Sequence, residues 1–312
     1  MKKLRVGDVD LSALCLSAAA FGTGVRGDAM FRLYDDFREA GGNFFDTAHC
    51  YCFWSEGGAG SSERALGECL RRSGDREQVF IGTKGGHPAV LPKYPRPDAF
   101  LSPEVIASDV QESLERLGVE RIDLYFLHRD DPRVPVGEIL SALNAEADRG
   151  RIRCLGASNW STCRIEAANV FAAQHGLRGF AASQPQWNLA SPNPPSDPTM
   201  KFITPDDEAW HVRHQIPVVA YSPTACGYFA SDDPSTSRAF DNPVSRARHR
   251  RARQLAAELG ATPNQIALAW LMAQPFPVIP ILGTTKREHL ADALAAASVP
   301  LSPEQARWLV VG

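Results

Sequence analysis

Short apolar runs alternate with segments of helical pattern along the chain, and this rhythm constrains the fold most. The runs recur roughly every 30 to 45 residues, the spacing typical of βαβ units. Eight strand cores lie near Leu14–Ala20, Asn43–Asp46, Val79–Lys84, Ile122–His128, Ile152–Ala157, Gly179–Gln184, Pro217–Tyr221 and Pro277–Leu282. Eight parallel strands are the number that a closed (β/α)8 TIM barrel requires, so we predict one α/β barrel domain over residues 1–312.

The helical segments carry start signals with a physical basis. Ser102-Pro103, Thr262-Pro263 and Ser302-Pro303 each place a capping hydroxyl before a proline at the first helical position. The last of these predicts a C-terminal helix. Lys2–Ser12 alternates around Gly7-Asp8, which predicts a short N-terminal β-hairpin outside the barrel.

Three segments fit the barrel pattern less well. Pro280 lies inside the eighth strand, where proline cannot donate a ladder hydrogen bond. The first strand, Leu14–Ala20, is rich in alanine. Ala190–Phe202 is rich in proline, and we expect a long ordered loop there.

Composition narrows the class of protein. Hydrophobic residues make up 44% and charged residues 22%, as in soluble globular proteins with a sizeable core. The net charge of −3 leaves no basic field, which argues against nucleic acid and membranes as partners. The 7 scattered cysteines indicate reduced thiols in a cytoplasmic protein, and their spacing matches no usual zinc motif, so we predict no metal.

Ionisable side chains follow three of the strands at the point where each strand ends. The run 43–45 leads into Asp46, the run 79–83 into Lys84 and the run 124–127 into His128, while Tyr51 follows five residues after Asp46. All strands of a parallel barrel open onto one face at their carboxyl ends, so we expect these four side chains to meet there.

These four residue types suit the reduction of a carbonyl group. The reaction needs a hydride donor and an acid that protonates the developing oxyanion. Tyrosine, with a pKa of about 10, is a weak acid unless a neighbouring cation such as Lys84 stabilises its phenolate. Asp46 would hold that lysine charged, and His128 could hydrogen-bond the carbonyl oxygen.

A glycine motif admits a different fold. Gly22-Thr23-Gly24-Val25-Arg26-Gly27 fits the G-x-G-x-x-G dinucleotide fingerprint, and Asp46 lies about twenty residues further on, where a ribose-binding acid would stand. A Rossmann fold, however, leaves Tyr51, Lys84 and His128 without roles. We therefore favour the barrel, and both interpretations point to a nicotinamide cofactor.

Several motifs resemble the aldo-keto reductase superfamily in the order expected of it. They are Asp46-Thr47-Ala48-His49-Cys50-Tyr51, Gly82-Thr83-Lys84, Leu124–His128, Gly156-Ala157-Ser158-Asn159, Gln184, Ala220-Tyr221-Ser222-Pro223 with Gly227, and Gly283-Thr284-Thr285 continuing to His289–Asp292. The resemblance covers most of the chain. It implies an enzyme that reduces an aldehyde, ketone or sugar-derived carbonyl with NADPH, with NADH as the alternative cofactor.

The resemblance also implies a role for each matching residue. Tyr51 would be the general acid, Lys84 and Asp46 would tune its pKa, and His128 would orient the carbonyl. Ser158, Asn159 and Gln184 would hold the nicotinamide carboxamide, and Tyr221 would stack on its ring. The remaining cofactor contacts would come from Gly22, Thr23, Ser222, Pro223, Gly227, Gly283, Thr284, Thr285, Lys286, His289 and Asp292.

Two positions depart from the family pattern. Gly283 stands where many members carry a basic residue for the 2′-phosphate of NADP, although Lys286 and Arg287 could substitute. Ala293 stands where an asparagine often contacts the adenine. The loop from Cys52 to Ser62 is longer than usual and places Phe53 and Trp54 close to Tyr51.

Two other functions are compatible with parts of the sequence. One is a cofactor-binding regulatory subunit of the same fold with little turnover, like the β subunits of potassium channels. The other is a metal-dependent barrel hydrolase that uses His49, His128, Asp130 and Asp131, although Lys84 would repel its ion. Substrate choice depends on loop shape, which a sequence pattern does not encode.

Overall fold

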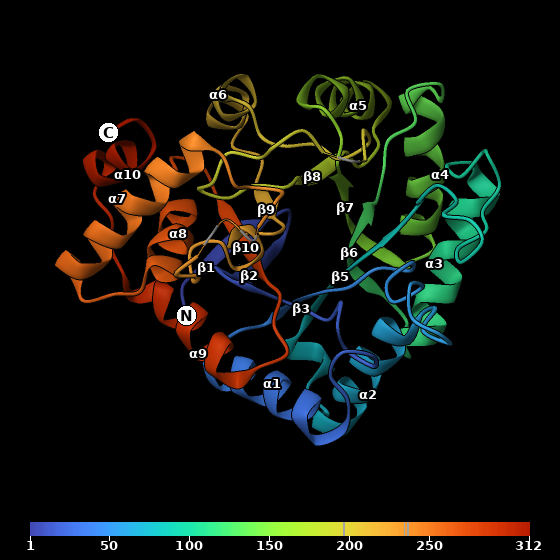
Figure 1. Ribbon diagram of the computed structural model, residues 1–312. Helices are drawn as coiled ribbons and strands as arrows, with labels where there is room; N and C mark the ends of the chain where they lie inside the picture. The colour runs from blue at the N-terminus through green and yellow to red at the C-terminus, as the bar shows by residue number, and fades with distance from the viewer. Residues whose placement is uncertain (196, 234, 236) are drawn as a thin grey trace.

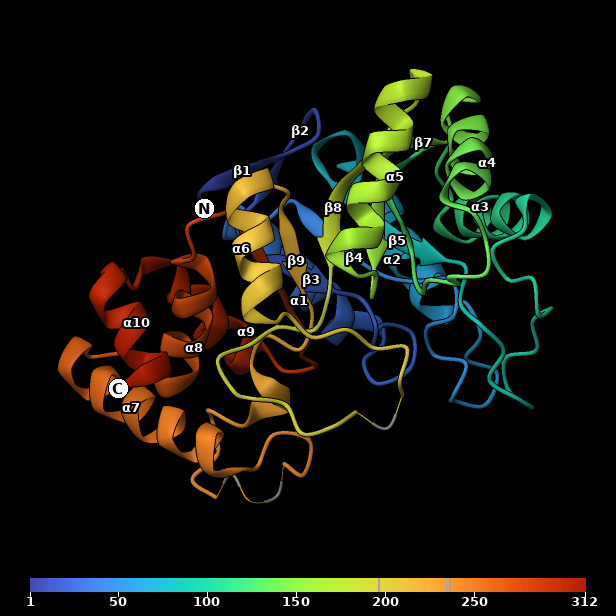
Figure 2. The ribbon, with the colours of Figure 1, turned by 90° about the horizontal axis from the view of Figure 1, so that it is seen from above.

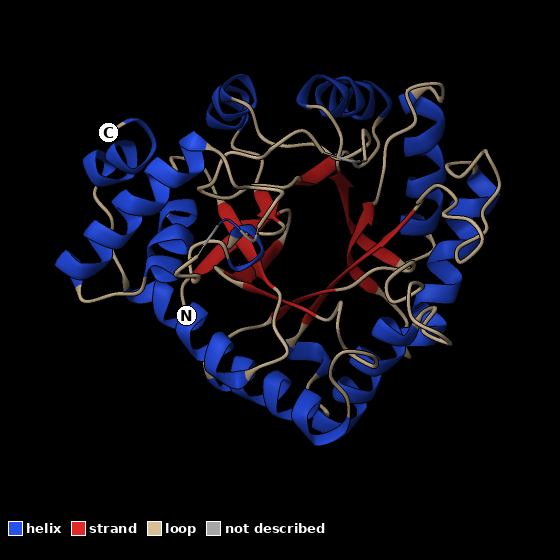
Figure 3. Cartoon of the chain, viewed as in Figure 1, coloured by secondary structure: helices blue, strands red, loops and turns tan. Residues whose placement is uncertain are grey.

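Eight parallel strands close into a barrel, as predicted from the sequence. The computed structural model describes residues 1–195, 197–233, 235 and 237–312. The barrel strands are β3 (Cys15–Ser17), β4 (Phe44–Asp46), β5 (Phe80–Gly85), β6 (Ile122–Leu127), β7 (Ile152–Ser158), β8 (Phe180–Gln184), β9 (Val218–Ala220) and β10 (Val278–Leu282). They pair in that order, and β10 closes the barrel against β3 (Figure 3).

Helices surround the barrel and cover its outer face (Figure 1). They are α1 (Gly27–Glu39), α2 (Ser61–Ser73), α3 (Pro103–Leu117), α4 (Val136–Asp148), α5 (Thr162–His175), α6 (Pro205–His214), α7 (Pro243–Leu259), α8 (Pro263–Met272), α9 (Arg287–Ala295) and α10 (Pro303–Val311). The hydroxyls of Ser102, Thr262 and Ser302 accept the capping hydrogen bonds expected of them. The C-terminal helix is α10.

The N-terminal hairpin closes one end of the barrel. Strands β1 (Lys3–Val6) and β2 (Val9–Ser12) pair antiparallel, and Val6, Val9 and Leu11 join the apolar cluster that fills the barrel. Figure 2 shows the hairpin at one end and the long loops that follow the strands at the other. A ligand therefore has access from the loop end, where the polar strand termini lie.

The alternation of side chains along each strand decides which of them face the barrel interior. Phe44 and Phe126 belong to the interior cluster, whereas Phe45 packs outward against the helices. Since the side-chain period of a strand is two, Asp46 shares the inward side with Phe44, and His128 shares it with Phe126. The strand-end residues therefore converge inside the mouth of the barrel.

The structure differs from the sequence expectations at the first strand and agrees with them at Pro280. The first strand is shorter than Leu14–Ala20, because only Cys15–Ser17 pairs with both neighbours. Pro280 does lie within β10, opposite Ala220 of β9. Closure holds β10 between β9 and β3, and this tertiary constraint outweighs one missing donor.

Outside residue 196, Ala190–Phe202 contains no helix or strand segment. Within the described residues, no helix has the length and apolarity to cross a membrane.

Close packing of α2 on α3 leads to a testable prediction. A Cβ atom added at Gly67 would lie 2.4 Å from the backbone oxygen of Leu117, which cannot move aside as a side chain can. We expect Gly67→Ala to lower the free energy of unfolding by about 1–3 kcal/mol or more. The matched control is Gly137→Ala, whose Cβ would have its three nearest contacts with the rotatable Phe171 ring. Urea unfolding of both variants should show the larger loss at position 67, and equal losses would contradict this packing argument.

Candidate active site

Lys84 lies at the centre of the polar cluster in the barrel mouth. Its Nζ donates hydrogen bonds to Asp46 Oδ2 at 2.7 Å, to the backbone oxygen of Thr47 at 2.7 Å and to the Tyr51 hydroxyl at 3.0 Å. All three ammonium donors are therefore used. The Nζ also lies 4.5 Å from the centre of the Tyr51 ring. The structure thus brings together the lysine, the carboxylate and the phenol that were predicted to act together.

The charges in this cluster oppose the effect of burial. Burial raises the pKa of Tyr51 and the Lys84 ammonium lowers it; burial prevails, and the pKa is about 12. Burial would by itself lower the pKa of Lys84, but the Asp46 carboxylate outweighs this and holds the pKa above its usual value. Asp46 is fixed on its other side by Gln184, whose Nε2 donates to Oδ1 at 3.0 Å. The lysine is therefore charged when it contacts the phenol.

His128 faces Tyr51 across the mouth. The two rings lie 5.8 Å apart in an edge-on arrangement, and the backbone nitrogen of His128 donates to the Gly85 oxygen at 2.8 Å. Burial lowers the pKa of His128 well below its usual value. A neutral imidazole and a phenol hydroxyl thus lie close enough to contact one small polar group together.

A cavity of about 320 Å³ opens beside these residues. Ten of its lining residues were predicted from the sequence, namely Asp46, Tyr51, His128, Ser158, Asn159, Gln184, Tyr221, Ser222, Pro223 and Gly283. The lining residues not predicted from the sequence are Ser17, Arg129, Met200, Thr224, Cys226 and Ile281. Ser17 could have been found, because it ends the first strand on the same side as Cys15. Met200 lies on the Ala190–Phe202 loop, whose path no local pattern encodes.

Three polar residues on one side of the cavity are joined by hydrogen bonds. Ser158 Oγ donates to the Gln184 backbone oxygen at 2.8 Å, and Asn159 Nδ2 donates to Ser158 Oγ at 3.1 Å. Asn159 has a φ of 59°, a left-handed conformation that asparagine tolerates better than most residues. The Tyr221 hydroxyl donates to Asn159 Oδ1 at 2.8 Å, which fixes the tyrosine ring at the cavity wall.

A second cavity, also of about 320 Å³, continues from the first along the end of β10. Its lining includes the predicted residues Gly283, Thr284, Thr285, Lys286 and His289, and Ser17 and Gly283 line both cavities. The two cavities therefore adjoin, and together they extend from the polar cluster to the start of α9. A dinucleotide needs an extended site of this kind.

The remaining predicted cofactor residues lie around this route. Thr23 lines an adjoining hollow, and Gly22, with φ 77°, packs close to Ser61. Gly227 ends the short helix η2 (Ala225–Gly227), next to the lining residue Cys226. Asp292 accepts hydrogen bonds from Thr262, Asn264 and Gln265 at the start of α8. Its contact with a cofactor stays a prediction.

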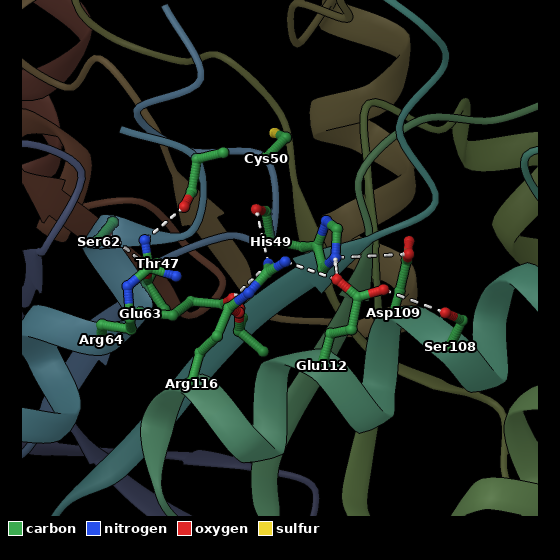
Figure 4. Close-up of polar contacts among 12 residues, drawn as sticks. Thr47, His49, Cys50, Ser62, Glu63, Arg64, Ser108, Asp109, Glu112 and Arg116 are labelled. Carbon is green, nitrogen blue, oxygen red and sulfur yellow. Dashed lines mark hydrogen bonds and ion pairs between the residues drawn. The ribbon is translucent and has the colours of Figure 1, made fainter. Parts of the chain in front are cut away.

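A buried polar network that was not predicted from the sequence supports the loop that carries Tyr51 (Figure 4). His49 is 4% exposed; its Nε2 lies 3.0 Å from Glu112 and its Nδ1 lies 2.7 Å from the Tyr94 hydroxyl. Arg116 of α3 donates to the His49 backbone oxygen at 3.3 Å and to the buried Glu63 at 3.3 Å. Residue 49 is thus tied to α3 two positions before Tyr51.

The structure does not support the two alternative sites considered from the sequence. The proposed hydrolase ligands do not meet, since His49 faces Glu112, Asp130 pairs with Arg164 and Asp131 pairs with Arg133. The Rossmann alternative is excluded by the closed parallel barrel. The glycine motif forms a turn after β3, in which the Gly22 nitrogen donates to the Val25 oxygen at 2.9 Å, and ends at Gly27, the first residue of α1.

Comparison with known proteins decides the family. Residues 13–309 match the model of the Aldo/keto reductase family. The chain belongs to this family. A solved structure of the thermostable aldo-keto reductase Tm1743, in complex with the inhibitor epalrestat, superposes with a TM-score of 0.74 at 25% identity, over 99% of this chain and 98% of that chain.

Two curated relatives are also informative. The aryl-alcohol dehydrogenase [NADP(+)] of Phanerodontia chrysosporium is 27% identical over 98% of this chain and 82% of its own length. A putative voltage-gated potassium channel subunit beta of Schizosaccharomyces pombe is 29% identical over 85% of this chain and 78% of its own length. Family membership and these matches identify the protein as an NAD(P)-dependent oxidoreductase.

Proposed function

We propose that the protein reduces an aldehyde, ketone or sugar-derived carbonyl with NADPH and that Tyr51 is the general acid. The observation that carries this proposal is the contact between the Lys84 ammonium and the Tyr51 hydroxyl at 3.0 Å, with Asp46 behind the lysine at 2.7 Å. A cation beside a phenol stabilises the phenolate that forms when the proton is donated. Lys84 and Asp46 are both buried, so this lysine is not an ordinary surface residue.

The residues of the cavity fit a nicotinamide cofactor. Ser158, Asn159 and Gln184 are buried and polar, and their amides and hydroxyl would hold the carboxamide. Tyr221 would present its ring face to the nicotinamide. The reduced cofactor, when bound, would supply the hydride. Tyr51 then gives its hydroxyl proton to the carbonyl oxygen, while the neutral His128 hydrogen-bonds that oxygen and orients it.

The choice of NADP rests on Lys286. Arg287 donates two hydrogen bonds to Asp36, from Nε at 2.6 Å and from Nη2 at 2.7 Å. This edge of the guanidinium group is therefore not free to bind a phosphate. Lys286 lines the second cavity and is the cation we propose for the 2′-phosphate of NADP. The relative from Phanerodontia chrysosporium, an aryl-alcohol dehydrogenase [NADP(+)], is named for this cofactor. NAD remains the second choice, because Gly283 offers no charge.

The partner we propose is therefore a small carbonyl compound. A regulatory subunit with little turnover is the second candidate, and the channel-subunit relative favours it. The two functions share the cofactor site and differ in whether carbonyl reduction is fast.

A carbonyl panel tests the proposal. Aldehydes, ketones and sugar-derived carbonyls would be supplied with NADPH or NADH, and oxidation of the cofactor would be followed by absorbance. We expect sustained turnover with at least one carbonyl class and a lower KM for NADPH than for NADH. Tight NADPH binding with no more than one turnover across the panel would instead support the subunit.

A further inference from the structure

Three metal-binding side chains meet beside Tyr51, although they are far apart in the sequence. Cys50 lies on the loop after β4, His87 follows β5 and His128 follows β6. One ligand atom from each lies within 4.8 Å of the other two. Adjacent strands of the barrel bring these three loops together.

We propose that Cys50, His87 and His128 form a binding site for a single Zn²⁺ ion. We call these residues the thiol–imidazole cluster. One thiolate and two imidazoles are ligands that zinc prefers, and a set of three protein ligands leaves the fourth tetrahedral position open. The binding itself is independent of the proposed reductase activity.

The distances are close to those that zinc requires. Zn–S bonds of about 2.3 Å and Zn–N bonds of about 2.0–2.1 Å place tetrahedral ligand atoms about 3.5 Å apart. Cys50 Sγ already lies 3.4 Å from His128 Nδ1. The rings of His87 and His128 lie 4.9 Å apart, so a modest rotation of the His87 side chain would complete the site.

His87 is held in the form that can bind a metal. Its Nδ1 lies 2.8 Å from the backbone oxygen of Pro88. A proton on Nδ1 that is donated to this carbonyl leaves the lone pair of Nε2 free. Zinc-binding histidines are oriented in the same way, by a hydrogen bond from the second ring nitrogen.

The neighbouring charges permit a cation. Lys84 is neutralised by Asp46 at 2.7 Å, and Arg129 is paired with Asp197 at 3.2 Å. The Cys50 thiol would lose its proton on binding, and the resulting thiolate offsets one of the two charges of the ion. In Figure 4 the Cys50 side chain points away from His49, so the thiol is not engaged by the network on α3.

A metal ion on this cluster would place a positive charge beside Tyr51 and hold the His128 ring through Nδ1, so the ring could no longer adjust to a carbonyl group. We therefore expect Zn²⁺ to inhibit carbonyl reduction. This consequence, unlike the binding, rests on the role proposed for His128, and the binding test below uses a readout other than activity.

Cobalt absorption tests the binding directly. The metal-free purified chain would be titrated with Co²⁺, and thiolate ligation produces a sulfur-to-cobalt charge-transfer band. We expect the band to saturate at one ion per chain and to disappear when Zn²⁺ is added. Cys50→Ser should abolish it, and His87→Ala should weaken Co²⁺ binding by about tenfold or more. Circular dichroism would establish that both variants are folded.

The matched control is Cys163→Ser, which removes an exposed thiol on α5. It should leave the band and the affinity unchanged. Absence of the band in the unsubstituted chain would overturn the proposal and leave Cys50 as a hydrogen-bond partner of His128. A band that survives in Cys50→Ser, or that is lost in Cys163→Ser, would also overturn it, as adventitious binding only.

Discussion

Tyr51→Phe should abolish carbonyl reduction while leaving the affinity for NADPH almost unchanged. The substitution removes the proposed proton donor and one hydrogen bond from Lys84, but very little binding surface. General acid catalysis contributes about 10²–10⁴-fold to rate, so we expect kcat to fall by at least that range. Steady-state kinetics with the best carbonyl of the panel would give kcat, and fluorescence titration would give the Kd for NADPH.

The control for this substitution is Tyr34→Phe on α1. The Tyr34 hydroxyl donates to Asp75 at 2.6 Å, outside the barrel mouth. Tyr34→Phe also removes one phenol hydroxyl from the protein. The folded variant should keep a kcat within about twofold of the original value. If the kcat of Tyr51→Phe were as high as that of Tyr34→Phe, a group other than Tyr51 would have to be the general acid.

Lys84→Met should also stop turnover, by a different route. The Tyr51 phenol stays in place, but the cation that stabilises its phenolate is lost, so the pKa of Tyr51 should rise above its value of about 12. An acid of higher pKa transfers its proton less readily, and we expect kcat to fall by about 10²-fold or more. A spectroscopic titration of the phenolate would measure the pKa shift.

The pH dependence follows from the direction of that shift. A general acid acts in its protonated form, which Tyr51 keeps below its pKa of about 12. Reduction in the unsubstituted protein should therefore not decline between neutral pH and about pH 10 through loss of the phenol proton. In Lys84→Met the decline should move to still higher pH.

Lys84→Met also leaves Asp46 buried without its partner, which costs about 3–5 kcal/mol in comparable cases. The double variant Lys84→Met/Asp46→Asn removes both charges and should recover stability without recovering kcat. Recovery of turnover together with stability would show that Lys84 acts through folding alone. A Tyr51 titration in the single variant that does not move would contradict the pairing of cation and phenol.

Much of the fold and of the catalytic cluster could be predicted from the sequence, because the patterns that encode them are local. Capping hydroxyls mark helix starts within three residues, as at Thr262. The apolar runs predicted as strands each lead into an ionisable residue, which placed Asp46, Lys84 and His128 at the carboxyl ends of adjacent strands. The resemblance to a known family then gave an expected role to each of them.

Other features depend on contacts between residues that are distant in sequence. Arg129 and Met200 reach the same cavity from the end of β6 and from a loop that begins after β8. The hydrogen bond between His49 and Glu112 requires the packing of α3 beside the Tyr51 loop. No short-range pattern records such packing.

The sequence by itself determined the order of strands and helices and the strand ends at which ionisable groups appear. The tertiary structure alone decided that Lys84 uses all three donors and that Cys50, His87 and His128 meet. The physical reason is that periodicity and capping act over a few residues. Loop paths and side-chain convergence are set by closure of the barrel, which joins segments separated by tens of residues.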